Sequence, residues 1–170
     1  MKVGSTIGIP SAPAIAFPDG TVGSPDIRDA ERLQGFPEDW TKSAEEIAKP
    51  NIRWKLVGNA VTVDVISWIA KKILAPEQYD SSQDNELGKN KWPNSCWGAD
   101  GKRFASSSTL YPVDRVEVSL SEYLRYPCKP LSYKAAKGFE SRLVSGTVRS
   151  PQFFVNAIHQ YVERKGKENG

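Results

Sequence analysis

The chain has 170 residues, enough for one domain of ordinary size or two small ones, and 39% of them are hydrophobic. A formal net charge of +3 does not by itself indicate a nucleic-acid-binding protein, and two cysteines with one histidine exclude a disulfide framework and leave too few ligands for a zinc site. No segment resembles a signal peptide or a transmembrane run, so we expect a cytoplasmic protein without membrane association or structural metal.

The first predicted helix follows an irregular N-terminal stretch. Residues 1–24 are interrupted by prolines and are expected to be irregular or to form short strands. Ser24-Pro25-Asp26 is typical of a helix start, with a capping hydroxyl, a proline in the first turn and an acid near the positive end of the helix dipole. Gly35 is expected to end this helix, and the proline two residues later prevents its continuation.

Three further elements are predicted before residue 75. Ser43 to Glu46 has the pattern of a capping box and predicts a very short helix that stops at Pro50. Residues 53–56 are expected to be extended and to lead into a turn at Gly58-Asn59. Residues 62–74 have the clearest helical pattern of this half, because valines and isoleucines at positions 61, 65, 69 and 73 share one stripe.

The second half begins with a polar stretch, residues 76–91, which we interpret as a linker. Residues 92–115 are rich in tryptophan and glycine and predict turns and short strands. Three helices are expected after them, at about residues 119–126, 132–145 with a stop at Gly146, and from Ser150-Pro151 onward. The chain is therefore predicted to be mostly α with minor β, an α+β fold.

Arg28 and Arg32 are the first candidate functional residues. They are four residues apart in the predicted helix, so both side chains lie on the same side of one turn. Their forked donors could bind carbonyl, carboxylate or phosphate oxygens. A solvated helix face would show the same spacing.

The second candidate is the stretch from Lys55 to Val65, in which Gly58-Asn59 directly precedes the predicted helix. An asparagine amide and the exposed N–H groups of a helix start suit a ligand that bears a carboxylate. An ordinary turn before a helix would contain the same two residues.

Together the two stretches resemble the ninth and tenth sequence motifs of the DNA (cytosine-5) methyltransferases. The slots of the ninth motif are filled in order by Arg28, Asp29, Arg32, Leu33, Gln34, Gly35, Phe36 and Pro37. The interval to Gly58-Asn59 also matches the family. The chain departs from the tenth motif at Leu56, where glutamine is usual, and at Thr62, where proline is frequent.

The resemblance implies roles for both sets of candidates. In the family, the glycine-asparagine turn touches S-adenosylmethionine and the following helix packs against the cofactor domain, so Asn59, Ala60 and Val61 are the implied cofactor contacts. The ninth motif organises the target-recognition domain and its junction with the catalytic domain. Arg28 and Arg32 are therefore implied to be architectural.

The parts of that family that perform methyl transfer are missing from these 170 residues. The chain contains no Phe-x-Gly-x-Gly cofactor turn, no Pro-Cys-Gln nucleophile loop and no Glu-Asn-Val segment. Pro127-Cys128 is followed by Lys129 rather than glutamine, and we expect Cys128 to be non-catalytic. We predict no catalytic residue in this chain.

Residues 92–170 resemble, in part, an extension found behind the tenth motif in some bacterial methyltransferases. Basic residues alternate with aromatic ones at Lys102, Arg103, Arg115, Arg125 and Arg142. They could touch a DNA backbone or form the charged rim of a small core, and we favour the second. His159 lies beside the apolar stripe of the last helix and is expected to be structural.

We divide the chain into a methyltransferase C-terminal motif region (1–75), a linker (76–91) and a mainly helical extension (92–170). The expected fold is a C-terminal fragment of the methyltransferase fold followed by a small helical module. The leading interpretation is the C-terminal part or small subunit of a bacterial restriction–modification DNA (cytosine-5-)methyltransferase. It would be inactive until a large catalytic subunit or domain joins it on double-stranded DNA, and the initial methionine favours a natural small subunit. The alternatives are a non-catalytic remnant that serves as a protein-interaction module, with self-association through an exposed helix, and a DNA-binding accessory.

Overall fold

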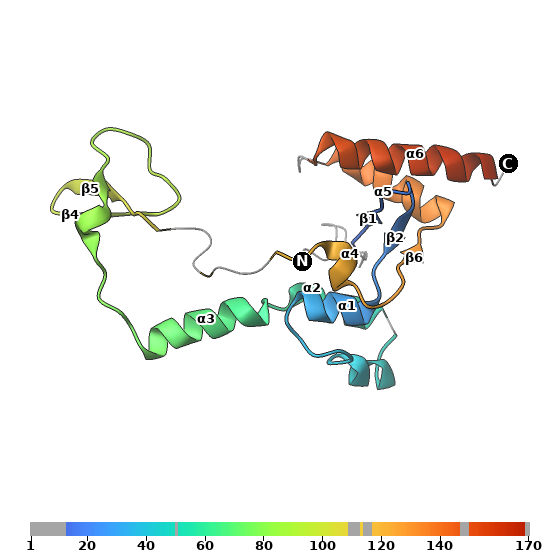
Figure 1. Ribbon diagram of the computed structural model, residues 1–170, viewed down its shortest axis with the longest axis horizontal. Helices are drawn as coiled ribbons and strands as arrows, with labels where there is room; N and C mark the ends of the chain where they lie inside the picture. Colours follow the sequence, from blue (N-terminus) through green and yellow to red (C-terminus); the bar gives the residue numbers. More distant parts are fainter. Residues whose placement is uncertain (1–12, 50, 109–112, 114–116, 147–149, 169–170) are drawn as a thin grey trace. The chain divides into compact units, whose positions relative to one another are not determined.

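The computed structural model describes residues 13–49, 51–108, 113, 117–146 and 150–168. Its α-helices are α1 (Ile27–Leu33), α2 (Ile52–Asn59), α3 (Val63–Leu74), α4 (Leu120–Tyr123), α5 (Tyr133–Ser145) and α6 (Gln152–Glu168) (Figure 1). The described part also holds 3₁₀-helices η1 (Lys42–Glu46) and η2 (Ser81–Gln83) and the short strands β1 (Ile15–Ala16), β2 (Val22–Ser24), β3 (Asn85–Glu86), β4 (Cys96–Ala99), β5 (Lys102–Ala105) and β6 (Lys129–Pro130). The predicted mainly helical α+β class is confirmed.

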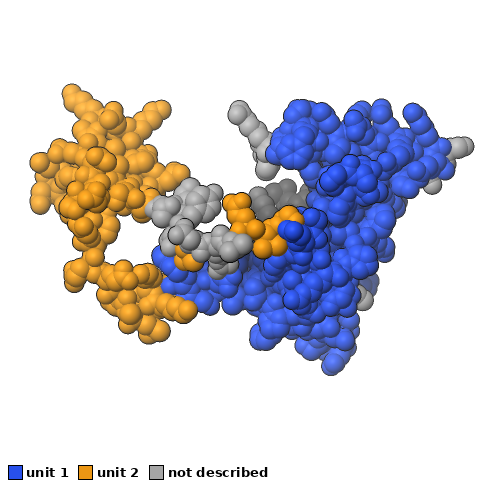
Figure 2. Space-filling view, in the orientation of Figure 1, with its two compact units in different colours: residues 1–68, 120–170 blue, residues 69–119 orange. Residues whose placement is uncertain are grey.

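The chain forms two compact units, one from residues 1–68 and 120–170 and the other from residues 69–119 (Figure 2). This division does not follow the predicted boundaries after residues 75 and 91. Residues 120–170 belong to the same unit as the first 68 residues, and the stretch predicted as a linker contributes η2 and β3 to the second unit.

The core of the first unit lies between a small sheet and two long helices. Strand β2 pairs antiparallel with β1 on one side and β6 on the other, and α6 packs against β1 and β2 while α5 packs against α6 (Figure 1). The buried residues here are Val22, Ala136, Ile158, Tyr161 and Val162. The Tyr161 hydroxyl donates to the Leu131 carbonyl at 2.7 Å, which satisfies the polar end of this buried ring.

The predicted boundaries of α5 are confirmed. The Ser132 hydroxyl accepts a hydrogen bond from the backbone N–H of Ala135 at 3.3 Å, so Ser132 is the N-cap, and the helix ends at Ser145 directly before Gly146. The last helix begins close to the predicted Ser150-Pro151 start.

Helix α1 begins two residues later than its capping pattern predicts. Asp26, rather than Ser24, is the N-cap, because its carboxylate accepts the backbone N–H of Arg28 at 2.9 Å. The predicted stop at Gly35 is confirmed, since its φ of +82° is a left-handed value that favours glycine. A Cβ added to Gly35 would lie 3.1 Å from the Cβ of Val63, so this glycine also permits the close approach of α3.

The prediction of an extended segment at residues 53–56 and a turn at Gly58-Asn59 is wrong. All six residues belong to α2, and the chain turns at Ala60 instead. The buried positions of α2 are Arg53 and Val57, one helical turn apart. Because one of the two buried residues is charged, the helix shows no apolar period that a sequence pattern could detect.

The second unit holds the sheet β3–β5–β4. Trp97 and Phe104 stack across β4 and β5 with ring centres 4.4 Å apart, and the Asp84 carboxylate accepts hydrogen bonds from the Tyr79 hydroxyl and the Trp97 indole, both at 2.6 Å. The predicted turns and short strands of residues 92–115 are confirmed where the structure describes them, whereas Arg115 lies outside the described residues. In the described part of the chain, no helix has the length and apolar character needed to cross a bilayer.

Candidate functional site

Arg28 is held by groups of its own unit. Its Nε and Nη2 atoms lie 2.8 and 3.0 Å from the two carboxylate oxygens of Asp26, and this pairing holds the pKa of Asp26 below its ordinary value. The guanidinium carbon also lies 3.5 Å from the ring centre of Tyr126. Arg28 thus joins the start of α1 to a residue almost a hundred positions later.

Arg32 contacts the same later segment. Its Nη1 donates to the Asp29 carboxylate at 2.5 Å and to the Tyr123 carbonyl at 3.0 Å, and its guanidinium lies 4.5 Å from the Tyr123 ring centre. The Tyr123 hydroxyl donates back to the Arg32 carbonyl at 2.8 Å. Both candidate arginines are therefore occupied by contacts within the chain.

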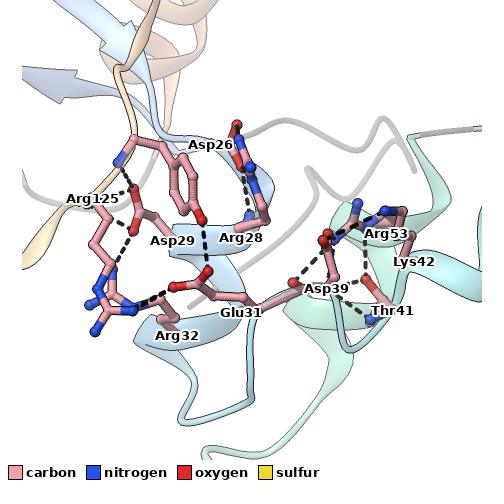
Figure 3. Close-up of polar contacts among 12 residues, drawn as sticks. Asp26, Arg28, Asp29, Glu31, Arg32, Asp39, Thr41, Lys42, Arg53 and Arg125 are labelled. Atoms are coloured by element: carbon pink, nitrogen blue, oxygen red, sulfur yellow. Dashed lines mark hydrogen bonds and ion pairs between the residues drawn. The ribbon is translucent and has the colours of Figure 1, made fainter.

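Two carboxylates complete the attachment of residues 123–126 to α1 (Figure 3). Asp29, which is fully buried, accepts the backbone N–H groups of Arg125 at 3.2 Å and Tyr126 at 3.0 Å. Glu38 accepts the Tyr126 hydroxyl and the Arg125 guanidinium, each at 2.7 Å, and these bonds lower the pKa of Glu38. The ninth-motif helix is thus a docking platform for residues 123–126.

Arg53 forms the centre of a second polar cluster that sequence reasoning missed (Figure 3). Its side chain is only 6% exposed and lies within 3.2 Å of oxygens on three carboxylates, those of Glu31, Asp39 and Glu45. Burial alone would lower the pKa of Arg53, but the hydrogen bonds to these carboxylates outweigh it and raise the pKa. Glu31 also accepts the backbone N–H of Thr41 at 2.9 Å, so the cluster fixes the loop after α1.

Gln34 joins the end of α1 to the segment that carries the predicted cofactor contacts. It is 2% exposed, its amide nitrogen donates to the Val57 carbonyl at 3.3 Å, and its amide oxygen accepts the Thr62 hydroxyl at 2.6 Å. Its backbone carbonyl accepts the N–H of Val63 at 2.8 Å. The C-cap residue of the ninth-motif helix therefore fixes the corner between α2 and α3, and the threonine that departs from the family pattern supplies one of these bonds.

The corner itself carries the three predicted cofactor contacts. Asn59 is the last residue of α2, Ala60 is extended with φ −70° and ψ 150°, and Val61 is 59% exposed. The Asn59 side chain is exposed and forms no hydrogen bond with another described residue, so its amide is available to a ligand. The N–H of Val63 is already bonded to Gln34, which leaves fewer free helix-start donors than the sequence suggested.

A shallow hollow of about 290 Å³ lies beside the corner. It is lined by Phe36, Trp40, Thr41, Ser43, Ala44, Leu56, Val57 and Ala60. Phe36 and Trp40 stack with their ring centres 5.9 Å apart, and the indole is 62% exposed. The hollow is mainly apolar and includes Ala60, the residue that follows Asn59.

Helix α3 exposes an apolar face directly after the corner. Val65, Ile66, Ile69 and Ile73, called here the open face of α3, are 51%, 48%, 40% and 72% exposed. They occupy an arc of about 100° of the helix, as expected for a core-facing stripe. An amphipathic helix with such a face normally packs against another element.

The reactive-looking residues outside this region show no sign of catalysis. Burial and the nearby Asp29 raise the pKa of the half-buried Cys128, which disfavours a thiolate nucleophile. His159 is 62% exposed, with its Nδ1 2.6 Å from Glu140, and that bond raises its pKa. Among the described residues, no group of three or more metal-ligating side chains is placed to hold an ion.

Comparison with known proteins shows similarity to one family of enzymes. The family model for C-5 cytosine-specific DNA methylases matches residues 26–75, the segment that holds α1, the Arg53 cluster, the corner and the open face of α3. A curated relative, the type II methyltransferase M2.BsuMI of Bacillus subtilis (strain 168), is 39% identical over an alignment that covers 97% of this chain and 44% of the relative. The chain therefore spans less than half the length of that relative. No solved structure matches.

Proposed function

We propose that this chain, which is similar to the C-5 cytosine-specific DNA methylases, is the C-terminal part or small subunit of a bacterial DNA (cytosine-5-)methyltransferase of a restriction–modification system. It acts in the cytoplasm, together with a catalytic half that holds the cofactor turn, the nucleophile and the assisting acid. The observation that carries the proposal is the juxtaposition, inside the matched segment, of the exposed Asn59 corner and the open face of α3.

The open face of α3 is the proposed contact with the catalytic half. Full burial of a valine or isoleucine side chain contributes about 1.5–3 kcal/mol, and each residue of this face is already partly covered, so each gains a fraction of that value. More than half of the relative's length lies outside the aligned region. A segment of that length is large enough to be the catalytic half that packs on this face. The partner can lie in the same polypeptide or in a separate one.

The corner residues fit a role as one wall of the S-adenosylmethionine site. Asn59 offers an amide that no described residue occupies, and the Gln34 bonds to Val57, Thr62 and Val63 hold its backbone in place. Ala60 and Val61 add apolar surface beside the hollow lined by Phe36 and Trp40. The cofactor, when bound, supplies the methyl group; this chain orients the cofactor and excludes water from one side of it.

Arg28 and Arg32 act architecturally in this proposal. Their contacts run to Tyr123 and Tyr126, so they hold residues 123–126 in place rather than bind DNA directly. Through this attachment they position the C-terminal half of the chain, which we propose supports the DNA target-recognition domain in the complete enzyme.

The test is reconstitution of methyl transfer. The purified chain is mixed with radiolabelled S-adenosylmethionine and duplex DNA, with and without the polypeptide that carries the Phe-x-Gly-x-Gly, Pro-Cys-Gln and Glu-Asn-Val motifs. We expect no transfer by the chain alone, transfer by the pair, and a higher KM for S-adenosylmethionine with Asn59→Ala. Sequence-specific methylation by the chain alone would contradict the proposal.

The open face of α3 also favours a second candidate, a non-catalytic interaction module that associates with itself. In that case the chain forms dimers whose dissociation constant rises with Ile69→Asp, and no methyltransferase partner is needed. Light scattering over a concentration series distinguishes the self-associating module from the methyltransferase component. The module forms dimers as the concentration rises, whereas the methyltransferase component associates with the catalytic half in preference to itself.

A further inference from the structure

Charge is distributed unevenly along this nearly neutral chain. Residues 120–170 contain nine Lys and Arg against four Asp and Glu, whereas residues 1–119 contain fourteen against sixteen. The excess positive charge therefore resides in the C-terminal segment, which includes α5 and α6. A net charge of +3 for the whole chain conceals this local excess.

Helix α5 has an inner and an outer side. Ala136 is fully buried, and Phe139 meets Phe154 of α6 edge to face with ring centres 6.2 Å apart, which defines the inner side. Lys134, Lys137 and Arg142 project from the opposite side and are exposed. These three residues, called here the basic face of α5, share that side with the hydroxyl of Ser141, whereas the Ser145 hydroxyl donates to the Ser141 carbonyl at 2.8 Å.

The cations of the basic face make no ion pair with any described residue. The acids of the two helices are engaged elsewhere, since Glu140 and Glu163 lie 2.6 and 3.4 Å from the His159 ring nitrogens and Glu168 pairs with Lys165. Among the other basic residues that the sequence suggested for DNA contact, Arg125 pairs with Glu38 and Lys102 pairs with Glu86. Arg103 donates to the Gly88 carbonyl instead, so it shares with Arg142 the lack of an ion pair to a described carboxylate.

An open hollow lies beside the basic face at the start of α5. It has a volume of about 610 Å³ and is lined by Pro130, Leu131, Ser132, Tyr133, Lys134, Lys165 and Glu168. Two of its three charged groups are cationic. Lys134 thus belongs both to the hollow and to the basic face.

We propose that the basic face of α5 binds the phosphate backbone of duplex DNA without reading its sequence. The span from Lys134 to Arg142 covers eight residues, about 12 Å along the helix, and a DNA strand presents one phosphate per ~3.4 Å of helix axis, so the three cations can contact successive phosphates. Cationic side chains and hydroxyls are the usual donors to phosphate oxygens. The inference deepens the proposed function, because it assigns a backbone contact to the DNA substrate of the complete enzyme.

The test measures binding of the full chain to a fluorescent duplex that contains only A·T pairs, across a salt series. Because this duplex has no cytosine and the assay has no cofactor or catalytic half, binding does not depend on target recognition or methyl transfer. The test variant is Lys134→Gln/Lys137→Gln/Arg142→Gln. The matched control is Lys49→Gln/Lys89→Gln/Lys91→Gln, which removes the same charge from exposed lysines elsewhere.

We expect the slope of log K against log salt to fall in magnitude by about 2.7 for the test variant, since each lost phosphate contact removes about 0.9. The control should keep the wild-type slope. The inference is overturned if the wild-type chain does not bind at low salt, if the test variant keeps the slope, or if the control loses as much. Thermal unfolding checks that both variants fold, and reconstituted methyl transfer reports separately on the proposed function.

Discussion

The two halves of the family-matched segment differ in where their side chains find partners. The first half, from Asp26 to Arg53, has most of its charges paired inside the chain, with Asp29, Glu31 and Arg53 all buried. The second half, from Asn59 to Ile73, leaves an amide and an apolar face exposed. The first motif thus stabilises this chain through paired charges, while the second presents polar and apolar side chains that are exposed.

The difference shows that residues of one matched segment can have unlike surroundings in the folded chain. Arg28 and Arg32 have the spacing of ligand-binding groups in the sequence, but in the structure their guanidinium groups contact the rings of Tyr126 and Tyr123. Apolar residues that resemble a core stripe are instead exposed. Substitutions should therefore affect stability strongly on the paired side and weakly on the open side.

The largest expected effect comes from Arg53→Ala. Removal of the guanidinium leaves the buried carboxylate of Glu31 without its cation, and breaking such a pair costs about 3–5 kcal/mol. Urea unfolding measures the free energy of unfolding, with Lys49→Ala as an exposed control expected to stay within about 0.5 kcal/mol. A loss below about 1 kcal/mol for Arg53→Ala would show that the cluster does not stabilise the fold.

A smaller loss is expected from Asp29→Asn. The amide can still accept one backbone N–H of residues 125–126 but no longer pairs with Arg32, and a buried charge-assisted bond contributes about 1.5–3 kcal/mol. Combination with Tyr123→Phe in a double-mutant cycle tests whether α1 and residues 123–126 form one network. Strictly additive losses would separate the two contacts.

A third effect depends on pH. The pKa of Glu38 is lowered in the folded chain by the Tyr126 and Arg125 hydrogen bonds, so this group contributes stability above its unfolded pKa of about 4.5 that is lost as the pH falls through the lower, folded pKa. We expect Glu38→Gln to reduce the dependence of unfolding on pH in this acidic range. An unchanged pH profile would show that the lowered pKa has no influence on stability.

The smallest expected effect on stability is that of Ile69→Asp on the open face of α3. The residue is 40% exposed, so the free energy of unfolding should change by no more than about 0.5–1 kcal/mol. Association with the catalytic half should nevertheless weaken by tenfold or more, because a charge is then placed against an apolar surface. Circular dichroism and titration calorimetry measure the two quantities on the same sample.

Local signals carried most of the accurate sequence-based predictions. The Ser132 cap, the Gly35 stop and the amphipathic pattern of α3 each depend on residues a few positions apart. The α2 helix was missed because a buried arginine occupies its inner face, and Arg53 finds its acids 8 to 22 residues away. The attachment of residues 123–126 to α1 joins positions more than 90 apart, which no spacing rule detects.

The most direct test of the account is calorimetric titration of this chain with the catalytic half encoded beside it or in the same polypeptide, using wild-type protein and Ile69→Asp. The account predicts a one-to-one complex for the wild type, with the negative heat-capacity change of apolar burial, and a complex weakened at least tenfold for the variant. Equal affinity for both proteins, or no coding sequence with the missing catalytic motifs, would contradict the claim that α3 completes a methyltransferase.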